Sequence, residues 1–405
     1  MPYATMVTDR CHPNKGAWAA RWLALGAFCI MFPAYIAYQI FVQKAVIRPY
    51  LGGYFSAGMA ISFPLLLLAA YVKPRPRIPL DLVEWLFVLF MALFGISLAV
   101  GVYFNVTSDI LKPNAVTWGT FVVLYLFGLL FPWGDRTATC CMQLVLLGLV
   151  PLILLNSTGG QLIGVGYIPP EIGMELNYQA VAIAYILVTL AAIPPARVLV
   201  RYAGYAVSIV ALYLIGARSE FVAFALMAGT IEFCMARRKA LLVMLGIIGI
   251  VLALVLAHAI LGTLPGTRIL GLSDMSEDAS AIARAELMAN AWLSISNSPL
   301  VGDYGSYAPG KYAHNILSAW VDMGLAGIVT LALLLVFAAA NLGLTYRQQI
   351  RTSMFLVTAA LLVANILLLL FAKYYAYQLL PIAIGAYGNL RRQCAADHVV
   401  TQTHT

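Results

Sequence analysis

The residues best suited to chemistry in this chain stand in the run Tyr312-Ala313-His314-Asn315, directly before a long apolar segment. A histidine titrates near neutral pH, so His314 is able to take a proton from a hydroxyl group. Because it lies where a polar loop meets an apolar helix, the imidazole is expected to reach both water and lipid headgroups. The position predicts proton-transfer chemistry at a membrane surface.

Two arginines complete a candidate constellation with this histidine. Arg218 lies in a very short connection between two apolar segments, residues 216–220, so it must lie at or just inside the membrane interface. Arg284 lies on an expected helix within a long loop. Guanidinium groups bind phosphate oxygens through a planar, permanently charged fork. Together with His314, the two arginines would suit a lipid-linked sugar phosphate.

Each of these residues also has a simpler interpretation when it is taken alone. Arginines near span ends commonly reach toward headgroups, which accounts for Arg218 and Arg284 without a ligand. His314 is equally well explained as an interfacial residue at a helix start. Asp322, about two turns into a span, is typical of a carboxylate that faces a bundle interior or a cavity. A further cluster at a span end indicates an interfacial aromatic belt: Lys373, Tyr374, Tyr375 and Tyr377.

The elements that must position these residues are membrane helices. Hydrophobic residues make up 62% and charged residues 10% of the 405 residues, which excludes a water-soluble globular protein. The apolar runs long enough to cross a bilayer predict an all-α polytopic membrane protein, one helical domain over 1–405 with about twelve spans. These spans are expected at 17–42, 55–72, 82–104, 116–132, 140–157, 178–193, 196–215, 220–235, 240–261, 315–342, 353–372 and 374–390.

The basic residues indicate a membrane topology and not nucleic-acid binding. Of the 24 Lys and Arg residues, 16 fall in the N-terminal segment or in alternate loops, which are therefore expected to be cytoplasmic together with both termini. The first apolar segment is too long for a signal peptide and is interpreted as the first span. No cysteine falls in an outer loop, so the sequence predicts neither a disulfide framework nor a metal site.

The outer face carries the two longest connections, residues 158–177 and 262–313, and is the expected place of function. Residues 273–278 supply capping groups and negative charge for a helix start. We expect that helix over about 278–296, followed by a glycine-rich approach to the histidine. Its amphipathic pattern places the apolar face on Ile282, Ala285, Met288, Ala289 and Trp292.

Four short motifs occur in order around the candidate residues. Gly216-Ala217-Arg218-Ser219 comes first, and the helix that bears Arg284 leads to Asn297-Ser298-Pro299-Leu300-Val301-Gly302; Ala313-His314-Asn315 and Met323-Gly324-Leu325-Ala326-Gly327 follow. In this order and membrane placement, they resemble the superfamily of O-antigen polymerases and O-antigen ligases. The resemblance covers residues 212–330.

The resemblance implies a GT-C-like membrane glycosyltransferase of the bacterial inner membrane, with residues 262–313 as a periplasmic loop. Its donor would be an undecaprenyl-pyrophosphate-linked glycan. Arg218 and Arg284 would bind the pyrophosphate, and His314 would act on the acceptor hydroxyl or help to hold the reacting groups. Direct attack by the acceptor hydroxyl, with His314 as the base, would invert the anomeric centre. No metal or other cofactor is expected, because pyrophosphate is already a good leaving group and fixed cations stabilise its charge.

Further residues complete the expected site. Asn315, Lys311 and Arg268 are predicted to bind substrate, and Asn315 is also placed to orient the imidazole. Tyr312 and Asp322 are the supporting residues. Asp322 would support His314 from below if both lie on one helix face, although eight residues of helix leave them about 80° apart.

The resemblance leaves polymerase and ligase open. A polymerase joins lipid-linked repeat units to one another, and a chain-length regulator would be a partner; a ligase moves the chain to lipid A-core. We favour the polymerase because the outer loop is compact. A transporter or flippase also fits twelve spans, but no internal repeat is found and the polar features gather at one face. A structural scaffold leaves the arginines and the histidine unexplained.

Overall fold

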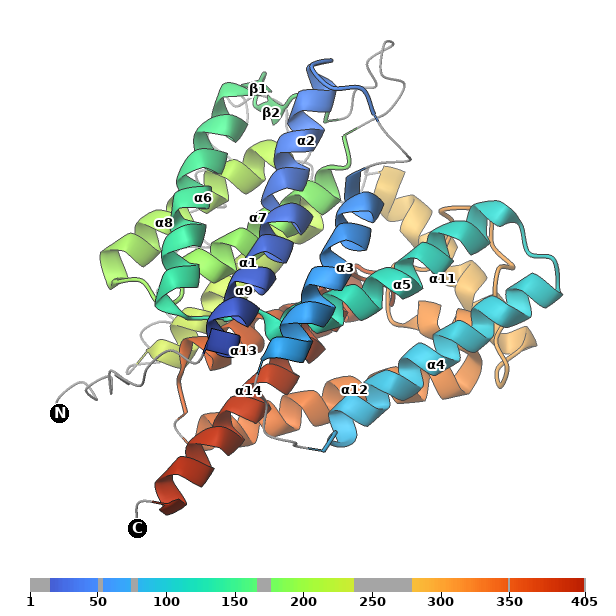
Figure 1. The fold of residues 1–405 in the computed structure, drawn as a ribbon. Helices are drawn as coiled ribbons and strands as arrows, with labels where there is room; N and C mark the ends of the chain where they lie inside the picture. Colours follow the sequence, from blue (N-terminus) through green and yellow to red (C-terminus); the bar gives the residue numbers. More distant parts are fainter. Residues whose placement is uncertain are drawn as a thin grey trace.

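The computed structural model describes residues 15–49, 54–73, 79–165, 176–236, 279–348 and 350–403. The fold is helical (Figure 1), apart from one short hairpin of strands β1 and β2. The elements are α1 Lys15–Met31, α2 Pro33–Gln43, α3 Tyr54–Val72, α4 Leu82–Tyr103, α5 Ser108–Leu130, α6 Arg136–Leu155, β1 Ser157–Thr158, β2 Gln161–Leu162, α7 Tyr178–Ala192, α8 Val198–Ile215, α9 Arg218–Met235, α11 Ala279–Asn297, α12 Leu317–Arg347, α13 Ser353–Phe371 and α14 Leu379–Thr403.

Within the described residues, eight helical segments are long and apolar enough to cross a membrane, and α1 with α2 counts as one of them. The prediction of an all-α polytopic membrane protein is confirmed at this level. Three further predicted spans are also helical, as α7, α9 and α14, whereas the predicted span 240–261 lies outside the described residues. The last span was predicted too early: α14 begins at Leu379, because residues 372–378 form an irregular connection.

The charged residues of α9 explain why this helix is less apolar than its neighbours. Its Glu232 accepts a hydrogen bond of 3.0 Å from Nη2 of Arg201 on α8, and its Glu220 pairs with Lys373. Glu232 therefore faces α8, and Glu220 faces the connection between α13 and α14, so that neither carboxylate faces the apolar exterior. This matches the rule that charges within membrane helices are paired inside the bundle.

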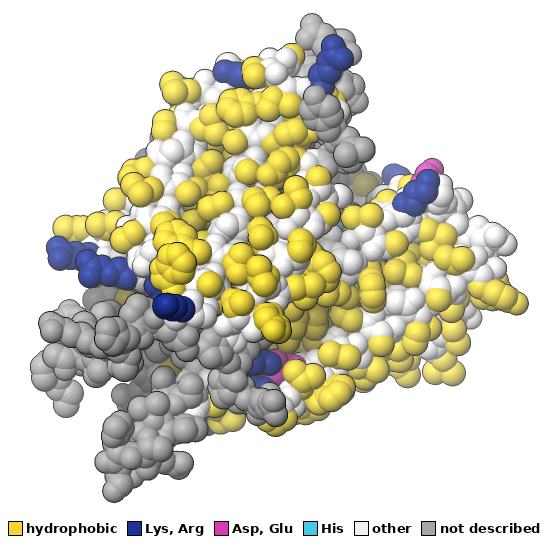
Figure 2. All heavy atoms as spheres, viewed as in Figure 1, with side chains coloured by type: hydrophobic (Ala, Val, Ile, Leu, Met, Phe, Trp, Pro, Cys, Tyr) yellow, Lys and Arg dark blue, Asp and Glu magenta, His cyan; other side chains and the backbone are white. Residues whose placement is uncertain are grey.

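Apolar side chains cover the outside of the helices, and basic side chains gather near helix ends (Figure 2). Leu144 and Leu147 on α6 are 70% and 71% exposed, and Leu199 on α8 is 84% exposed. By contrast, α7 and α13 are buried along most of their length. Such exposed leucines fit contact with lipid, and α7 and α13 form the interior of the bundle.

One end of the bundle is fastened by ion pairs. Glu84 at the start of α4 is 1% exposed and forms ion pairs with two residues of α14, Arg391 at 2.6 Å and Arg392 at 2.8 Å. Arg21 on α1 pairs with Asp135 before α6 at 3.2 Å. The start of α1 and the end of α14 point to the same end of the molecule (Figure 1). Arg21, Arg391 and Arg392 at this end belong to the segments that the sequence assigns to the cytoplasm.

The helix α12 is broken at Gly324, where φ is 66° and ψ is −163°. The turn formed by residues 299–303 enters the break. The Leu325 N–H donates to the carbonyl of Pro299 at 3.1 Å, and the Asp303 N–H donates to the carbonyl of Val321 at 2.6 Å. In an unbroken helix, Leu325 would bond to Val321. The turn therefore satisfies the backbone N–H and C=O groups that the break releases.

We predict that Gly324→Ala destabilises the protein strongly. A Cβ at this position would lie 2.2 Å from the Leu300 carbonyl oxygen, and the backbone has the positive φ that L-residues avoid. Strain costs about 1–3 kcal/mol, and overpacking adds about 1–3 kcal/mol. Thermal unfolding in detergent measures the effect. Gly343→Ala in the same helix is the control, because nothing lies within 4 Å of its added Cβ; equal melting temperatures for both variants would contradict the prediction.

A second prediction concerns sidedness. Single cysteines introduced at Ser306 and Gln348 in a cysteine-free background should label from opposite sides of the membrane, because Ser306 precedes α12 and Gln348 follows it. The charge pattern places Gln348 in the cytoplasm. Labelling of intact and permeabilised cells with a membrane-impermeant maleimide decides this, and access to Ser306 only after permeabilisation would reverse the orientation.

Candidate functional site

The polar features gather at the end of the bundle opposite the Glu84 ion pairs. The loop between α11 and α12 reaches across this end and is held to α5, because Nδ2 of Asn114 donates to the Tyr304 hydroxyl at 3.0 Å. Gly101 on α4 allows the Tyr304 ring to approach, since a Cβ there would lie 2.6 Å from Cε1 of that ring. The loop is therefore supported at Tyr304 by α4 and α5, in addition to its contacts with α12.

Beneath this loop lies a cavity of about 450 Å³, here called the cationic cavity. The start of α7, the first turn of α9, the helix α11, the run before α12 and the α13–α14 connection all contribute to its wall. Its charged and titratable lining residues are Arg284, His314 and Lys373, with Tyr312, Tyr374 and Tyr377 beside them. Segments distant in sequence are thus brought together by the fold.

The cations of this cavity differ in how far they are neutralised. Nζ of Lys373 lies 2.6 Å from Oε1 of Glu220, a fully buried carboxylate that compensates its charge. Arg284 is exposed on α11, and no carboxylate in the described part of the chain forms an ion pair with it. The cavity lining named above contains no acid. It therefore offers a net positive surface to an anion.

The first turn of α9 adds to this positive character. Ser219 lines the cavity, and Ala217 at the N-cap position supplies no side-chain hydrogen bond to the first N–H groups of the helix. The helix dipole favours an anion at such a position, and Glu220 of the same turn is the buried carboxylate that pairs with Lys373.

His314 is half-buried in this wall, with its ring 5.0 Å from the ring of Tyr312. Burial lowers the pKa of His314 below its usual value, and the cations Arg284 and Lys373 lower it further. The neutral imidazole therefore prevails at neutral pH and is able to accept a proton. A hydroxyl group is the natural proton donor for it in this cavity.

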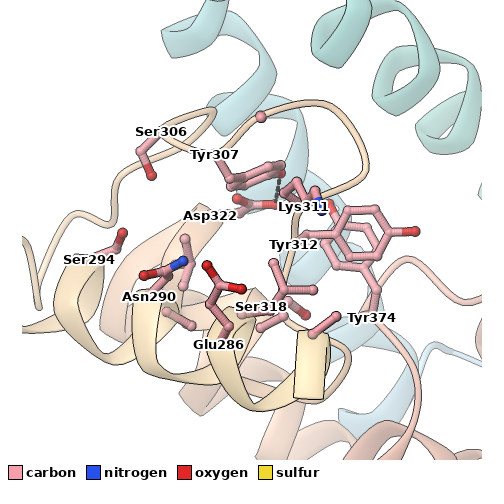
Figure 3. Close-up of a pocket in the computed structure, with 16 residues that line it drawn as sticks. Glu286, Asn290, Ser294, Ser306, Tyr307, Lys311, Tyr312, Ser318, Asp322 and Tyr374 are labelled. Carbon is pink, nitrogen blue, oxygen red and sulfur yellow. Dashed lines mark hydrogen bonds between the residues drawn. The ribbon is translucent and has the colours of Figure 1, made fainter. Parts of the chain in front are cut away.

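A second cavity of about 380 Å³ adjoins the first and is here called the carboxylate cavity (Figure 3). Asp322, only 2% exposed, lies in its wall and accepts hydrogen bonds at Oδ2 from the hydroxyls of Tyr307 at 3.0 Å and Tyr374 at 2.8 Å. Glu286 and Lys311 line the same cavity. The two cavities are neighbours because Tyr312 and Tyr374 belong to both walls.

The expected site residues are thus distributed over two cavities. Arg284, His314 and Tyr312 meet in the cationic cavity, and Lys311 and Asp322 meet in the carboxylate cavity. No hydrogen bond joins Asp322 to His314. His314 contacts the ring of Tyr312, which lies 4.5 Å from the ring of Tyr374, and Tyr374 in turn donates to Asp322.

Two other expected residues have positions of their own. Arg218 is half-buried at the first position of α9 and lines neither cavity, whereas its neighbour Ser219 does. Asn315 also lines neither cavity: its Oδ1 accepts from the Leu317 N–H at 3.0 Å, and its Nδ2 contacts the sulfur of Met288 at 3.1 Å. Asn315 therefore organises the start of α12 and ties it to α11. Arg268 lies outside the described residues.

The aromatic belt predicted at the end of α13 is wrong. Tyr375 is fully buried against the rings of Phe90 and Phe94, and Tyr377 lies in the cationic cavity. Burial of these rings in the bundle and along the cavity wall replaces the headgroup contact that the sequence pattern indicated. Lys373 was a sequence signal for the burial of these tyrosines, because a lysine in an apolar segment needs a buried acidic partner, which here is Glu220.

The helix predicted over about 278–296 is present as α11, but it buries a different face from the one predicted. Ala291 and Ile295 are buried, while Trp292 is 48% exposed and Met288 38% exposed. The side chain of Ile282 is outside the described part. Ala291 and Ile295 pack with Ala313 of the loop and Val321 of α12 in one small buried cluster.

No protein-family model matches this chain, and no curated protein matches it.

We predict that His314 titrates below the usual histidine pKa and that Arg284→Gln moves the value upward. The cation disfavours the imidazolium, so its removal favours proton uptake. NMR titration of labelled histidine in nanodiscs measures this, with His314→Asn identifying the signal. Arg347→Gln at the far end of α12 is the control and should leave the titration unchanged. A His314 pKa at or above 6.5 in the wild type would contradict the assignment of its neighbours.

Proposed function

We propose that this protein is a membrane glycosyltransferase that moves a glycan from undecaprenyl pyrophosphate to a sugar hydroxyl, acting as a repeat-unit polymerase on the periplasmic side of the bacterial inner membrane. The observation that carries the proposal is the cationic cavity, where Arg284 and a neutral His314 face one space. The motif resemblance supplies the substrate class, and the cavity supports it chemically.

The donor fits the cavity by charge. A pyrophosphate is a strong anion, and Arg284 offers a guanidinium fork that no described carboxylate occupies. Ser219, in the first turn of α9, lines the same cavity, at a helix end whose dipole favours an anion. Arg218, at the start of that turn, is proposed to contribute its charge from behind the cavity wall. These groups would stabilise the charge that develops as the pyrophosphate departs.

The acceptor hydroxyl is proposed to attack the anomeric carbon while His314 takes its proton. A new bond forms between the hydroxyl oxygen and the anomeric carbon. The bond between that carbon and the phosphate oxygen breaks, and its electron pair leaves with undecaprenyl pyrophosphate. Direct attack inverts the anomeric centre, and the imidazolium then releases its proton to solvent.

The broken helix bears on the alternative of a transporter. In transporters, discontinuous helices at mid-membrane commonly bind substrate or ions with their freed backbone groups. In α12, the groups freed at Gly324 bond to the turn of residues 299–303. This use of the break favours a structural role and supports the transferase over the transporter.

The proposal predicts that purified protein, given one defined undecaprenyl-pyrophosphate repeat unit and no other acceptor, forms a ladder of longer lipid-linked products. Arg284→Ala and His314→Ala should each reduce product formation at least about 100-fold, as expected for loss of charge stabilisation or of the base. Gel separation of the labelled products measures this.

The control is Arg347→Ala, an exposed arginine at the other end of α12, which should retain wild-type activity. No ladder from a matched substrate, followed by product on addition of lipid A-core, would assign the protein as the ligase. Wild-type ladders from both site variants would refute the site.

A further inference from the structure

The carboxylate of Asp322 lies in the wall of the carboxylate cavity, and one of its two oxygens has no hydrogen-bond partner among the described residues. Two tyrosine hydroxyls occupy Oδ2 of Asp322, but its Oδ1 is buried and has no hydrogen-bond partner among the described residues. Tyr375 also lies near this carboxylate without hydrogen-bond geometry. A buried polar atom left without a partner is costly, so a ligand that donates a hydrogen bond here would be favoured.

The remaining groups of the cavity show which donor suits it. Figure 3 shows Glu286 and Asn290 directed from α11 toward the side where Asp322 and Tyr307 lie. The cavity wall contains two acidic residues, Glu286 and Asp322, and one lysine, Lys311. Because acids outnumber bases, the cavity does not favour phosphate. Hydroxyl groups donate to carboxylate and amide oxygens, and the aromatic rings in the wall provide flat apolar surfaces for the faces of a sugar. The chemistry of the cavity matches a neutral carbohydrate.

We propose that the carboxylate cavity binds the acceptor sugar, with Asp322 receiving a hydrogen bond from one of its hydroxyls. This inference rests on the proposed function. The acceptor then lies beside Tyr312, from which the neighbouring cationic cavity and His314 are reached directly. Asp322 is a positioning residue: it holds the acceptor and takes no part in proton transfer.

The donor also carries a sugar, so the experiment must separate two sources of the same hydroxyl chemistry. The probe is one repeat unit on a short alkyl chain, which accepts a glycan but lacks the pyrophosphate needed to donate one. Initial rates are measured against this acceptor and, separately, against the undecaprenyl-pyrophosphate donor. Asp322→Asn keeps the size of the side chain but changes its charge and hydrogen bonding.

We expect Asp322→Asn to raise the KM for the acceptor about tenfold, because the amide oxygen would turn to the hydroxyls of Tyr307 and Tyr374 and the remaining NH2 group cannot accept a hydrogen bond from the acceptor. The KM for the donor should stay within about twofold of wild type, because the cationic cavity is intact. Asp109→Asn, at an exposed carboxylate in the first turn of α5, is the matched control and should alter neither value. A raised donor KM with an unchanged acceptor KM would overturn the acceptor assignment.

A second variant keeps the proposal testable should Asp322→Asn not fold. Asn290→Trp places a large ring in the cavity from the exposed face of α11 and should block the acceptor while the melting temperature is retained. Saturation-transfer NMR with the alkyl repeat unit, in the absence of donor, measures binding without catalysis.

The two proposals can fail separately. Binding of the repeat unit to wild type that is lost in Asn290→Trp supports the cavity even if no glycan is transferred, and the proposed function alone would then fall. Transfer in the wild type with unchanged acceptor KM and binding in folded variants would refute the cavity and leave the function standing.

Discussion

The insertion of the 299–303 turn into the break of α12 is the interaction on which the site depends. Gly324 and Gly302 allow backbone to pack against backbone there, since an added Cβ on Gly302 would lie 2.6 Å from the Gly324 nitrogen. The bonds from Leu325 and Asp303 fix the loop in register with α12. The same loop carries Tyr307 and Tyr312, so its docking sets both cavity walls. Without it, Asp322 would lose one of its two tyrosine partners.

The rings of Tyr312 and Tyr374 separate the positively charged residues of the cationic cavity from Asp322. Arg284 and His314 lie on one side of Tyr312 and Tyr374, and Asp322 lies on the other side. A glycosyl transfer between a pyrophosphate donor and a hydroxyl acceptor needs such a division, because the anion requires cations and the hydroxyl requires acceptors. Burial, and after it the proximity of Arg284, lowers the pKa of His314, so the same arginine would serve the donor and help to keep the base neutral.

The sequence predicted the helices well because membrane spans are determined by local apolar length. Errors occurred where tertiary contacts decide: the start of α14, the buried face of α11 and the tyrosines after α13. Hydrophobic periodicity and composition do not reveal that Tyr375 packs against Phe90 and Phe94. They also do not reveal that Lys373 forms an ion pair with Glu220. The motifs in the sequence identified Arg284 and His314, but residue spacing alone does not show that the Asn315 side chain accepts a hydrogen bond from the Leu317 N–H at the start of α12. The assignment of Asp322 to a separate cavity required the break at Gly324 and the loop docked in it.

The central claim is that the cationic cavity holds the pyrophosphate of a polyprenyl donor. The most direct measurement is a cryo-EM structure of the protein in nanodiscs saturated with undecaprenyl pyrophosphate. The account predicts density for two phosphates beside Arg284 and the first turn of α9, with the His314 ring facing the bound headgroup. A headgroup seated in the carboxylate cavity, or elsewhere on the bundle with the cationic cavity filled by water alone, would contradict it.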